Sequence, residues 1–253
     1  MSMAESGTGE RVVLAGRSAL VTGAGRRIGR AMAEALGQRG MAVVVHYSAS
    51  NAGAHETAQA IEKAGGRAHV IQADLLEPDA AARLVRDAAD LCGGLDLVVN
   101  SAATMNCTPI GSVTTDQWDD IIALNLRAPF FIAQAAAAVL RQGGSIINMA
   151  DLAAFETWPG YVPHGISKAG VVQMTRALAR ALGPAIRVNA IAPGAVLLPD
   201  GWDEATATRL ASTTPLRRLG EPQDVVDALL YLATSPYVTG QTLIVDGGRE
   251  VRH

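Results

Sequence analysis

The sequence predicts a doubly wound α/β fold, in which helices cover both faces of a parallel sheet. Its length of 253 residues suits one large domain, and 49% apolar residues are enough to bury the core of such a domain. Short segments rich in Val, Ile and Leu alternate with helical patterns along the chain. Because these segments are continuously apolar, we expect strands that are buried on both faces, between two helical layers.

Seven segments are expected to form the strands, and the stretches between them to form the helices. The strand segments are 19–22, 42–46, 68–72, 95–100, 145–149, 187–191 and 242–245. The helical stretches are 28–38, 52–64, 78–92, 114–140, 161–182 and 222–233. No repeat or low-complexity linker interrupts this order, so 1–253 is predicted to be a single domain.

Two segments are expected to lie outside this regular pattern. Residues 1–15 are predicted to form a loose N-terminal tail. An irregular insertion runs from Pro199 to Pro215, after the sixth strand. Ligands of open α/β sheets bind at the carboxyl ends of the strands, so this insertion with its flanks, residues 195–216, is predicted to be a substrate lid.

The overall composition narrows the class of function. The net charge is −3 and the charges are interspersed, so nothing favours binding to nucleic acid or to an anionic membrane. The most apolar long stretch, around 130–140, is too short for a membrane span. Cys92 and Cys107 provide neither a disulfide framework nor a metal cluster, and the histidines show no ligand spacing. We expect a cytoplasmic protein that acts on a small molecule and uses no metal.

A glycine-rich segment follows the first predicted strand. From Thr22 to Gly29 the sequence reads Thr-Gly-Ala-Gly-Arg-Arg-Ile-Gly and then continues into a helical pattern. Glycines allow a tight turn and a close approach to a diphosphate, whose charge the helix N-terminus stabilises. An ordinary strand-to-helix turn is the alternative, but the strand-turn-helix setting favours a dinucleotide site. Gly23, Ile28 and Gly29 are the candidate contacts.

The residues around the second strand favour NADPH over NADH. NAD-selective sites usually place a carboxylate at the end of this strand to hold the ribose 2′-hydroxyl, and no acid occurs between Met41 and His55. Arg26 and Arg27 offer guanidinium groups and Ser48 a hydroxyl, a set that suits a 2′-phosphate. Ser50 is a further hydroxyl in the same run. The alternative is that both arginines are solvated surface charges.

These motifs resemble the short-chain dehydrogenase/reductase family, whose turn reads Thr-Gly-x-x-x-Gly-x-Gly. Arg27 stands where the middle glycine is usual, and with the run 45–48, Val-His-Tyr-Ser, it looks like the pteridine reductase branch. The resemblance extends over almost the whole chain. It implies further cofactor contacts at Tyr47, Ser48, Asp74, Leu75, Asn100, Ala102, Pro193, Gly194 and Val196. Departures from the family pattern occur at Ser101, Ala103 and Leu198.

The same resemblance implies a catalytic set. The family has a Tyr-x-x-x-Lys pair on the helix after the fifth strand, a Ser or, in pteridine reductases, an Asp before it, and an Asn on the preceding helix. Lys168, Asp151 and Asn125 match three of these places, and Lys168 is expected to bind the nicotinamide ribose. The place of the tyrosine is taken by His164.

His164 lies four residues before Lys168, so the two side chains are expected to share one helix face. A histidine is a different proton donor from a tyrosine, because its ordinary pKa is about 6.5 rather than about 10. It either serves as a weaker acid or marks a protein that has lost activity. Tyr161 lies seven residues before Lys168 and is either a substitute donor or a packing residue.

The remaining expectations concern the pocket and the assembly. The candidates for the substrate wall, each of which could instead pack in the core, are Trp158, Tyr161, Met105, Cys107 and Trp202. The resemblance suggests a homotetramer built on the helices 114–140 and 161–182. Alanine-rich faces such as 135–138, and Ala177 with Ala181, would allow close approach of these helices.

Three functions remain in view. The leading one is an NADPH-dependent reductase that transfers hydride to a heterocyclic C=N bond or iminium, in detoxification or tailoring of a natural product or metabolite. A cyclic hemiaminal is one source of such an iminium. The second is the ketone/alcohol chemistry that is commoner in the family, with His164 or Tyr161 as acid, or reduction of a pterin. The third is an NADPH-binding regulator without turnover.

Overall fold

The computed structural model describes residues 10–197 and 203–251 and contains one seven-stranded parallel sheet. The strands follow the order β3-β2-β1-β4-β5-β6-β7. They are β1 (Ser18–Val21), β2 (Ala42–Tyr47), β3 (Arg67–Gln72), β4 (Leu95–Asn100), β5 (Leu140–Met149), β6 (Ile186–Pro193) and β7 (Thr242–Val245). All seven predicted strands are present, and the single doubly wound domain is confirmed.

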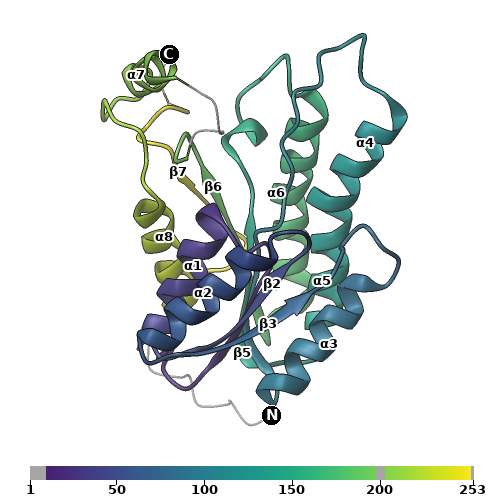
Figure 1. The fold of residues 1–253 in the computed structure, drawn as a ribbon, viewed down its shortest axis with the longest axis vertical. Coiled ribbons are helices and arrows are strands. Elements are labelled where there is room, and N and C mark those ends of the chain that lie inside the picture. The colour runs from purple at the N-terminus through teal and green to yellow at the C-terminus, as the bar shows by residue number, and fades with distance from the viewer. Residues whose placement is uncertain (1–9, 198–202, 252–253) are drawn as a thin grey trace, which may run out of the picture.

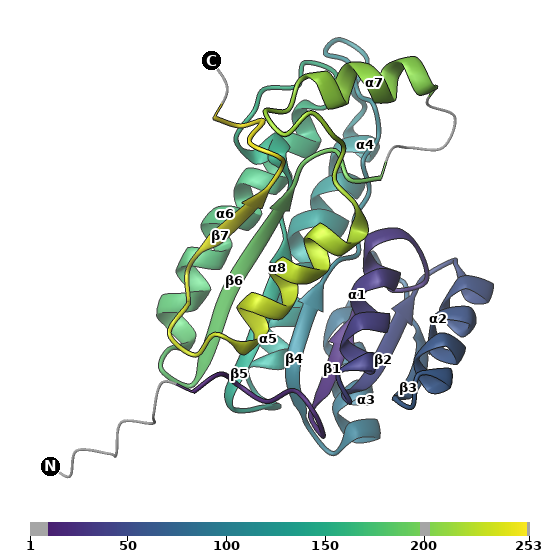
Figure 2. The ribbon, with the colours of Figure 1, turned by 90° about the vertical axis from the view of Figure 1, so that its left-hand side faces the viewer.

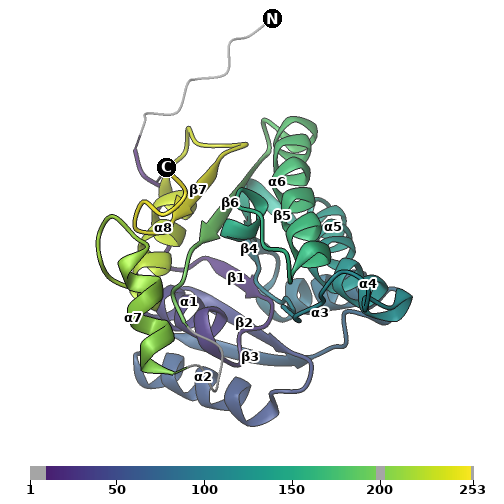
Figure 3. The same cartoon turned by 90° about the horizontal axis from the view of Figure 1, so that it is seen from above.

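Helices cover both faces of this sheet (Figures 1 and 3). One layer consists of α1 (Arg27–Gln38), α2 (Asn51–Lys63) and α8 (Pro222–Thr234). The other consists of α3 (Ala80–Cys92), α4 (Thr115–Ile122), α5 (Ala128–Ala136) and α6 (Val162–Leu182). A short helix, α7 (Glu204–Ser212), lies beyond the carboxyl ends of the strands (Figure 2).

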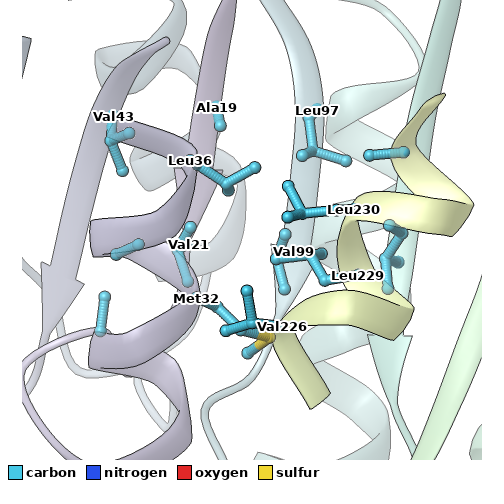
Figure 4. Packing of buried hydrophobic residues seen from close by; sticks show 14 of the residues in the cluster. Ala19, Val21, Met32, Leu36, Val43, Leu97, Val99, Val226, Leu229 and Leu230 are labelled. Atoms are coloured by element: carbon cyan, nitrogen blue, oxygen red, sulfur yellow. The ribbon is translucent and has the colours of Figure 1, made fainter. Parts of the chain in front are cut away.

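The core is formed where each helical layer meets the sheet. Figure 4 shows Met32 and Leu36 of α1 and Val226 of α8 packed toward Val21 and Val99 of the central strands. Successive side chains of a strand point to opposite faces, so the neighbours of these valines pack against α3 and α5 instead. The central strands are therefore buried on both faces, as predicted, whereas β3 and β7 at the sheet edges are partly exposed.

The helix expected over 114–140 is divided into three parts. After α4 the chain forms one π-helical turn, Ala123–Arg127, and α5 then ends at Ala136. Pro129 has no N–H to donate to the carbonyl of Asn125, which accounts for the interruption of the regular helix ladder at this point. The helix prediction is also wrong at its end, because β5 already begins at Leu140.

Two further expectations need correction. The insertion predicted as irregular contains the helix α7, whose first turn is capped by Asp203, although residues 198–202 lie outside the described part. The end of the predicted loose tail is packed onto the domain: Val12 donates its N–H to the Thr234 carbonyl and Leu14 is buried in the core. Residues 1–9 lie outside the described residues.

The strand order determines where a ligand can bind. The chain builds outward from β1 to β3, returns to place β4 beside β1, and then builds toward β7. A crevice at this change of direction is the usual ligand site of open α/β sheets, at the carboxyl ends of the strands. Among the described helices, none is long and apolar enough to span a membrane.

Candidate active site

The turn between β1 and α1 requires its glycines. Gly23 has φ +65°, and a Cβ there would lie 2.9 Å from the Cα of Ala102. A Cβ at Gly29 would lie 2.3 Å from the carbonyl oxygen of Gly23, so only glycine fits this approach. The N-cap Arg26 provides no side-chain cap, and the first turn of α1 holds no acid. This cradle leaves first-turn N–H groups for an anion, which fits a dinucleotide diphosphate.

His46, near the end of β2, anchors this turn and was not identified from the sequence. Its ring is buried, its Nδ1 accepts the N–H of Gly23 at 3.1 Å, and its Nε2 lies 3.0 Å from the carbonyl oxygen of Ala73. The imidazole therefore carries its proton on Nε2. Burial lowers the pKa of His46, and the hydrogen bond to Ala73 opposes the shift. This neutral ring joins the glycine turn to the end of β3, beside Asp74.

The groups expected around a 2′-phosphate lie at the same edge of the sheet. A Cβ on Gly25 would lie 3.0 Å from the carbonyl oxygen of Ser50, so the glycine turn packs directly on the segment that follows β2. Ser48 is exposed there, and Arg26 is exposed on the turn. Arg27, with φ +53°, donates from Nη2 to the carbonyl of Leu197 at 2.6 Å. Its guanidinium thus reaches the segment that leads to the predicted lid.

The other predicted cofactor residues lie at or just after the carboxyl ends of the strands. Ala102 lies against Gly23, and Asn100 donates to the Asn148 side chain across to β5. Pro193 ends β6, and Gly194 donates its N–H to the Val245 carbonyl. The remaining ones are Tyr47, half-buried at the end of β2, exposed Asp74 after β3, buried Leu75 and buried Val196.

Asn125, Asp151, His164 and Lys168 are brought together on the same side of the sheet. Asn125 lies in the π-helical turn and is held by the backbone of Thr104, whose N–H it accepts at 2.8 Å and whose carbonyl it contacts at 2.9 Å. Buried Lys168 donates to the carbonyl of Met149 at 2.8 Å. Burial lowers the pKa of Lys168 to about 8, and the negative charge of Asp151 opposes the shift.

His164 occupies a closed place between Thr104 and Asp151. Its side chain is 2% exposed, its Nδ1 lies 3.2 Å from the carbonyl oxygen of Thr104, and its Nε2 lies 3.7 Å from Oδ2 of Asp151. The amide nitrogen of Asn125 also lies 3.4 Å from Nδ1 of His164, but its shorter contacts are to the Thr104 carbonyl at 2.9 Å and to Ser167 at 3.2 Å. We therefore assign the Nδ1 proton of His164 to the Thr104 carbonyl. Its Nε2 has no hydrogen-bond partner among the described residues and faces the carboxylate.

With the Nδ1 proton assigned in this way, Nε2 of His164 carries no proton toward the carboxylate while the ring is neutral. If the imidazole is neutral, Nε2 and Asp151 are two acceptors that face one another, and a ligand with an O–H or N–H group would satisfy both. If the imidazole is protonated, it forms an ion pair with Asp151 and can donate a proton to a bound group. The pair can therefore bind a proton donor or act as one.

Two aromatic residues, Trp158 and Tyr161, lie in the segment that leads into α6. The rings of Trp158 and Tyr161 make an edge-to-face contact with centroids 6.2 Å apart. The Tyr161 hydroxyl interacts with Cys107, and burial together with Cys107 raises the pKa of Tyr161. A raised pKa makes Tyr161 a poorer acid, which favours its packing role. Of the other candidates for the substrate wall, Met105 is partly exposed and Trp202 lies outside the described residues. Leu198, one of the departures from the family pattern, also lies outside them.

Metal binding finds no support in the part of the chain that the structure describes. No group of three or more His, Cys, Asp or Glu side chains is placed to hold an ion there. Both cysteines are free, Cys92 on α3 and Cys107 in the loop after β4.

Comparison with known proteins identifies the family. A family model described as Enoyl-(Acyl carrier protein) reductase matches residues 23–250. The chain belongs to the short-chain dehydrogenase/reductase family. It is similar to the hydroxynaphthalene reductase-like protein of Metarhizium guizhouense, with 39% identity over 93% of this chain and 95% of that protein.

Solved structures agree with this assignment. A short-chain dehydrogenase/reductase of Serratia marcescens shares 33% identity and a TM-score of 0.90 over 94% of this chain and 100% of its own. The angucycline C-6 ketoreductase LanV, solved with bound NADP, shares 35% identity and a TM-score of 0.89 over 95% of this chain and 98% of its own. None of these three names a pteridine reductase, so that branch stays a prediction.

Proposed function

We propose that this short-chain dehydrogenase/reductase uses NADPH to reduce a heterocyclic C=N bond or iminium in a small metabolite or natural product. The observation that carries the proposal is the buried His164, which the family resemblance assigns to the place of the tyrosine. Its free Nε2 faces Asp151 at 3.7 Å, so the site offers a carboxylate and a ring nitrogen to a protonated nitrogen. Reduction of a C=N bond and reduction of a ketone, the two enzyme functions considered from the sequence, differ in how strongly they require a proton donor at this position.

The cofactor part of the proposal rests on the cradle after β1. Gly23 and Gly29 fit a diphosphate, and Arg26, with Ser48 nearby, suits a 2′-phosphate. Lys168 would hold the nicotinamide ribose, and LanV, a relative of the same fold, binds NADP. When bound, NADPH supplies the hydride. The role of the protein's own residues is to orient the substrate and to manage its proton.

The difference between His164 and tyrosine bears on the substrate class. A ketone that accepts hydride becomes an alkoxide and must be protonated as it forms, a contribution of about 10²–10⁴-fold. An iminium that accepts hydride becomes a neutral amine and needs no proton. Asp151 would stabilise the substrate cation, and Nε2 of His164 would accept its N–H. The observed pair therefore suits an iminium better than a ketone.

A cyclic hemiaminal is a plausible source of such an iminium. His164 as an imidazolium would protonate the departing hydroxyl, the C–O bond would break, and water and an iminium would form. Asp151 would balance the charge throughout, since it faces both the ring and the substrate. Reduction would turn a reactive, alkylating compound into an inert amine, which is why we place the activity in detoxification or tailoring.

Exposed side chains on the loops around the site favour an apolar ring system as substrate. Loops at the carboxyl edge of the sheet carry exposed apolar side chains, including Met105, Ile110, Phe155 and Leu216. Named relatives point the same way, since one is a hydroxynaphthalene reductase-like protein and another an angucycline ketoreductase. Those names also make ketone reduction the second candidate function. Pterin reduction and cofactor binding without turnover are the remaining outcomes.

We also propose a cytoplasmic homotetramer. Large apolar side chains are exposed on three helices of one layer: Trp118 on α4, Phe130 and Phe131 on α5, and Ile166 on α6. Ala177 and Ala181 are exposed on the same long helix α6, and such small residues allow close helix approach. Light scattering at micromolar concentration tests the assembly, and a monomer would refute it.

The function is tested by exchanging His164 for the family residue. Purified protein and His164→Tyr are compared on a panel of cyclic imines, cyclic hemiaminals, pterins and ketones with NADPH. The proposal expects the parent protein to reduce the imines and hemiaminals, and His164→Tyr to gain ketone reduction relative to imine reduction. Ketone reduction by the parent with no C=N activity would support the second candidate. Cofactor binding without any turnover would indicate a regulator.

A further inference from the structure

The chain segment after β7 forms an ordered turn that touches three parts of the site. Asp246 accepts the N–H groups of Gly248 at 2.8 Å and of Glu250 at 2.6 Å, which closes the turn. A Cβ on Gly194 would lie 2.9 Å from the Cα of Asp246, so the turn packs against the segment after β6. Leu216, at the end of the lid segment, donates its N–H to Gly247. The third contact is made by Arg249.

Arg249 forms a two-pronged ion pair with Glu156 in the loop between β5 and α6. Its Nε lies 3.0 Å from Oε1, and its Nη2 lies 2.8 Å from Oε2. The two side chains are 14% and 20% exposed, and they lie 93 positions apart in the sequence. Pairs of this geometry and burial are more rigid and directional than a typical surface ion pair.

The same pair determines how Trp158 is held. Trp158 donates from Nε1 to Oε2 of Glu156 at 2.8 Å, and the Arg249 guanidinium lies 5.9 Å from the centre of its ring. The edge of the indole is thus fixed by Glu156 and its face by a cation–π contact. Trp158 in turn meets the ring of Tyr161 edge to face. Together the two rings form an aromatic corner. Tyr161, the nearer of the two to His164 in the sequence, precedes it by three residues.

We propose that Arg249 is a positioning residue that, through Glu156 and Trp158, sets the aromatic corner to prefer fused-ring substrates over single-ring substrates. The proposal rests on the proposed function, because it names a determinant of the same site. A fused aromatic ring can contact both Trp158 and Tyr161, whereas a small single ring presents too little surface for both. Loss of Arg249 leaves the Glu156 carboxylate with only the indole N–H, and the orientation of Trp158 is no longer fixed from its face.

The kinetic test compares Arg249→Ala and Arg249→Lys with the parent protein. The substrates are 3,4-dihydroisoquinoline, which has two fused rings, and 1-pyrroline, which has one, both carrying a cyclic C=N bond. For Arg249→Ala we expect KM to rise about tenfold for the fused-ring imine, with kcat within about threefold. KM for 1-pyrroline stays within about twofold. Arg249→Lys should recover part of the loss, because lysine keeps the charge but not the planar fork.

A matched control separates this effect from general loss of an ion pair. Arg218 makes an equally two-pronged contact with Asp224, at 2.7 and 2.8 Å, on a more exposed surface. Arg218→Ala is expected to leave the KM ratio of the two imines unchanged. An equal rise of KM for both imines in Arg249→Ala, or an unchanged ratio, would overturn the proposal.

A second readout does not depend on turnover. In a background with Trp118→Phe and Trp202→Phe, Trp158 is the only tryptophan, so its fluorescence reports this corner. We expect Arg249→Ala to increase quenching by acrylamide and to weaken binding of tetrahydroisoquinoline, in the presence of NADP⁺, about tenfold. Arg218→Ala should do neither. If the parent reduces no imine, the proposed function fails, yet unchanged quenching or binding in Arg249→Ala would still independently overturn the role of Arg249.

Discussion

The Nε2 atom of His164 lies 3.7 Å from Oδ2 of Asp151, and no side chain of the described residues satisfies that nitrogen. The ring is fixed from its other side by the Thr104 carbonyl, 3.2 Å from Nδ1. Because the imidazole is buried and held at Nδ1, its free nitrogen has one orientation, toward the carboxylate. A tyrosine at this place would present a hydroxyl, which both donates and accepts hydrogen bonds, instead of an imidazole nitrogen. The proposed preference for a C=N substrate depends on this pair.

Removal of the Asp151 charge should impair iminium reduction more than cofactor binding. Asp151→Asn keeps the size of the side chain but no longer stabilises a substrate cation. We expect kcat/KM for a cyclic imine to fall about 100-fold, the size typical for loss of one preorganised electrostatic group. NADPH affinity, measured by fluorescence titration, should change by less than about threefold. Asp90→Asn on α3 is the control, and an equal loss in both variants would contradict the role of Asp151.

The pH dependence of NADPH use should report Lys168. Its folded-state pKa is lowered to about 8, so in the free protein its positive charge is lost as pH rises through that value. We expect kcat/KM for NADPH to decline above pH 8, because this parameter reports groups of the free enzyme. In Lys168→Arg, whose side chain stays charged, the decline should move beyond the measurable range. A parent profile that is flat to pH 10 would contradict the assignment.

The same shift carries a consequence for stability. The pKa of Lys168 in the folded protein, about 8, lies below the ordinary 10.5, so the unfolded chain binds the proton more tightly between these values. The contribution of this group is therefore full above pH 10.5 and is lost as pH falls toward 8. The contribution of Lys168 to the free energy of unfolding, measured with denaturant between pH 8 and pH 10.5, should therefore rise with pH. Use of NADPH should decline over the same range, so the two effects can be told apart.

Features that follow from sequence patterns were predicted, whereas features that depend on three-dimensional geometry were not. Continuous apolar segments predicted all seven strands, and the family resemblance placed Asn125, Asp151, His164 and Lys168, which the fold brings together. The division of the helix over 114–140 was missed, because the effect of Pro129 on the carbonyl of Asn125 depends on helix geometry rather than on periodicity.

Long-range side-chain contacts were also missed. His46 lies within an apolar strand pattern and looks like an ordinary core histidine, although it bridges Gly23 and Ala73. Nothing local connects Arg249 with Glu156, 93 positions earlier. The hydrogen bond from Arg27 to the Leu197 carbonyl is another case, since the sequence indicated either a phosphate contact or a solvated surface charge. Such pairs arise only once the parallel strands bring distant loops to one edge of the sheet.

Cofactor selectivity should depend on the arginines of the first turn. We expect NADPH to bind at least tenfold tighter than NADH, a difference of about 1.4 kcal/mol. Arg26→Ala should narrow this gap by weakening NADPH, because a guanidinium that pairs with the 2′-phosphate has no partner on NADH. Arg27→Ala should do so as well. Arg39→Ala, at the far end of α1, is the control; equal dissociation constants for the two cofactors in the parent would refute the selectivity.

Acid should destabilise the cofactor turn through His46. Burial lowers the folded-state pKa of His46 below the ordinary value of 6.5, so the group contributes fully above pH 6.5 and its contribution is lost as pH falls toward the lowered value. Protonation would also place a second N–H against the donor of Gly23. His46→Asn keeps an acceptor without titrating. Its melting temperature should depend less on pH between 7 and 5 than that of the parent, whereas His55→Asn should behave like the parent.

The central claim, that His164 and Asp151 suit a C=N substrate, is tested most directly by NADPH oxidation on two substrates of the same ring size. The parent protein is given 3,4-dihydroisoquinoline and, separately, 2-tetralone, with substrate-free reactions to subtract background oxidation. The account predicts that kcat/KM for the imine exceeds that for the ketone by about 100-fold or more, the range expected when a strong proton donor is missing. Ketone reduction that equals or exceeds imine reduction would contradict it.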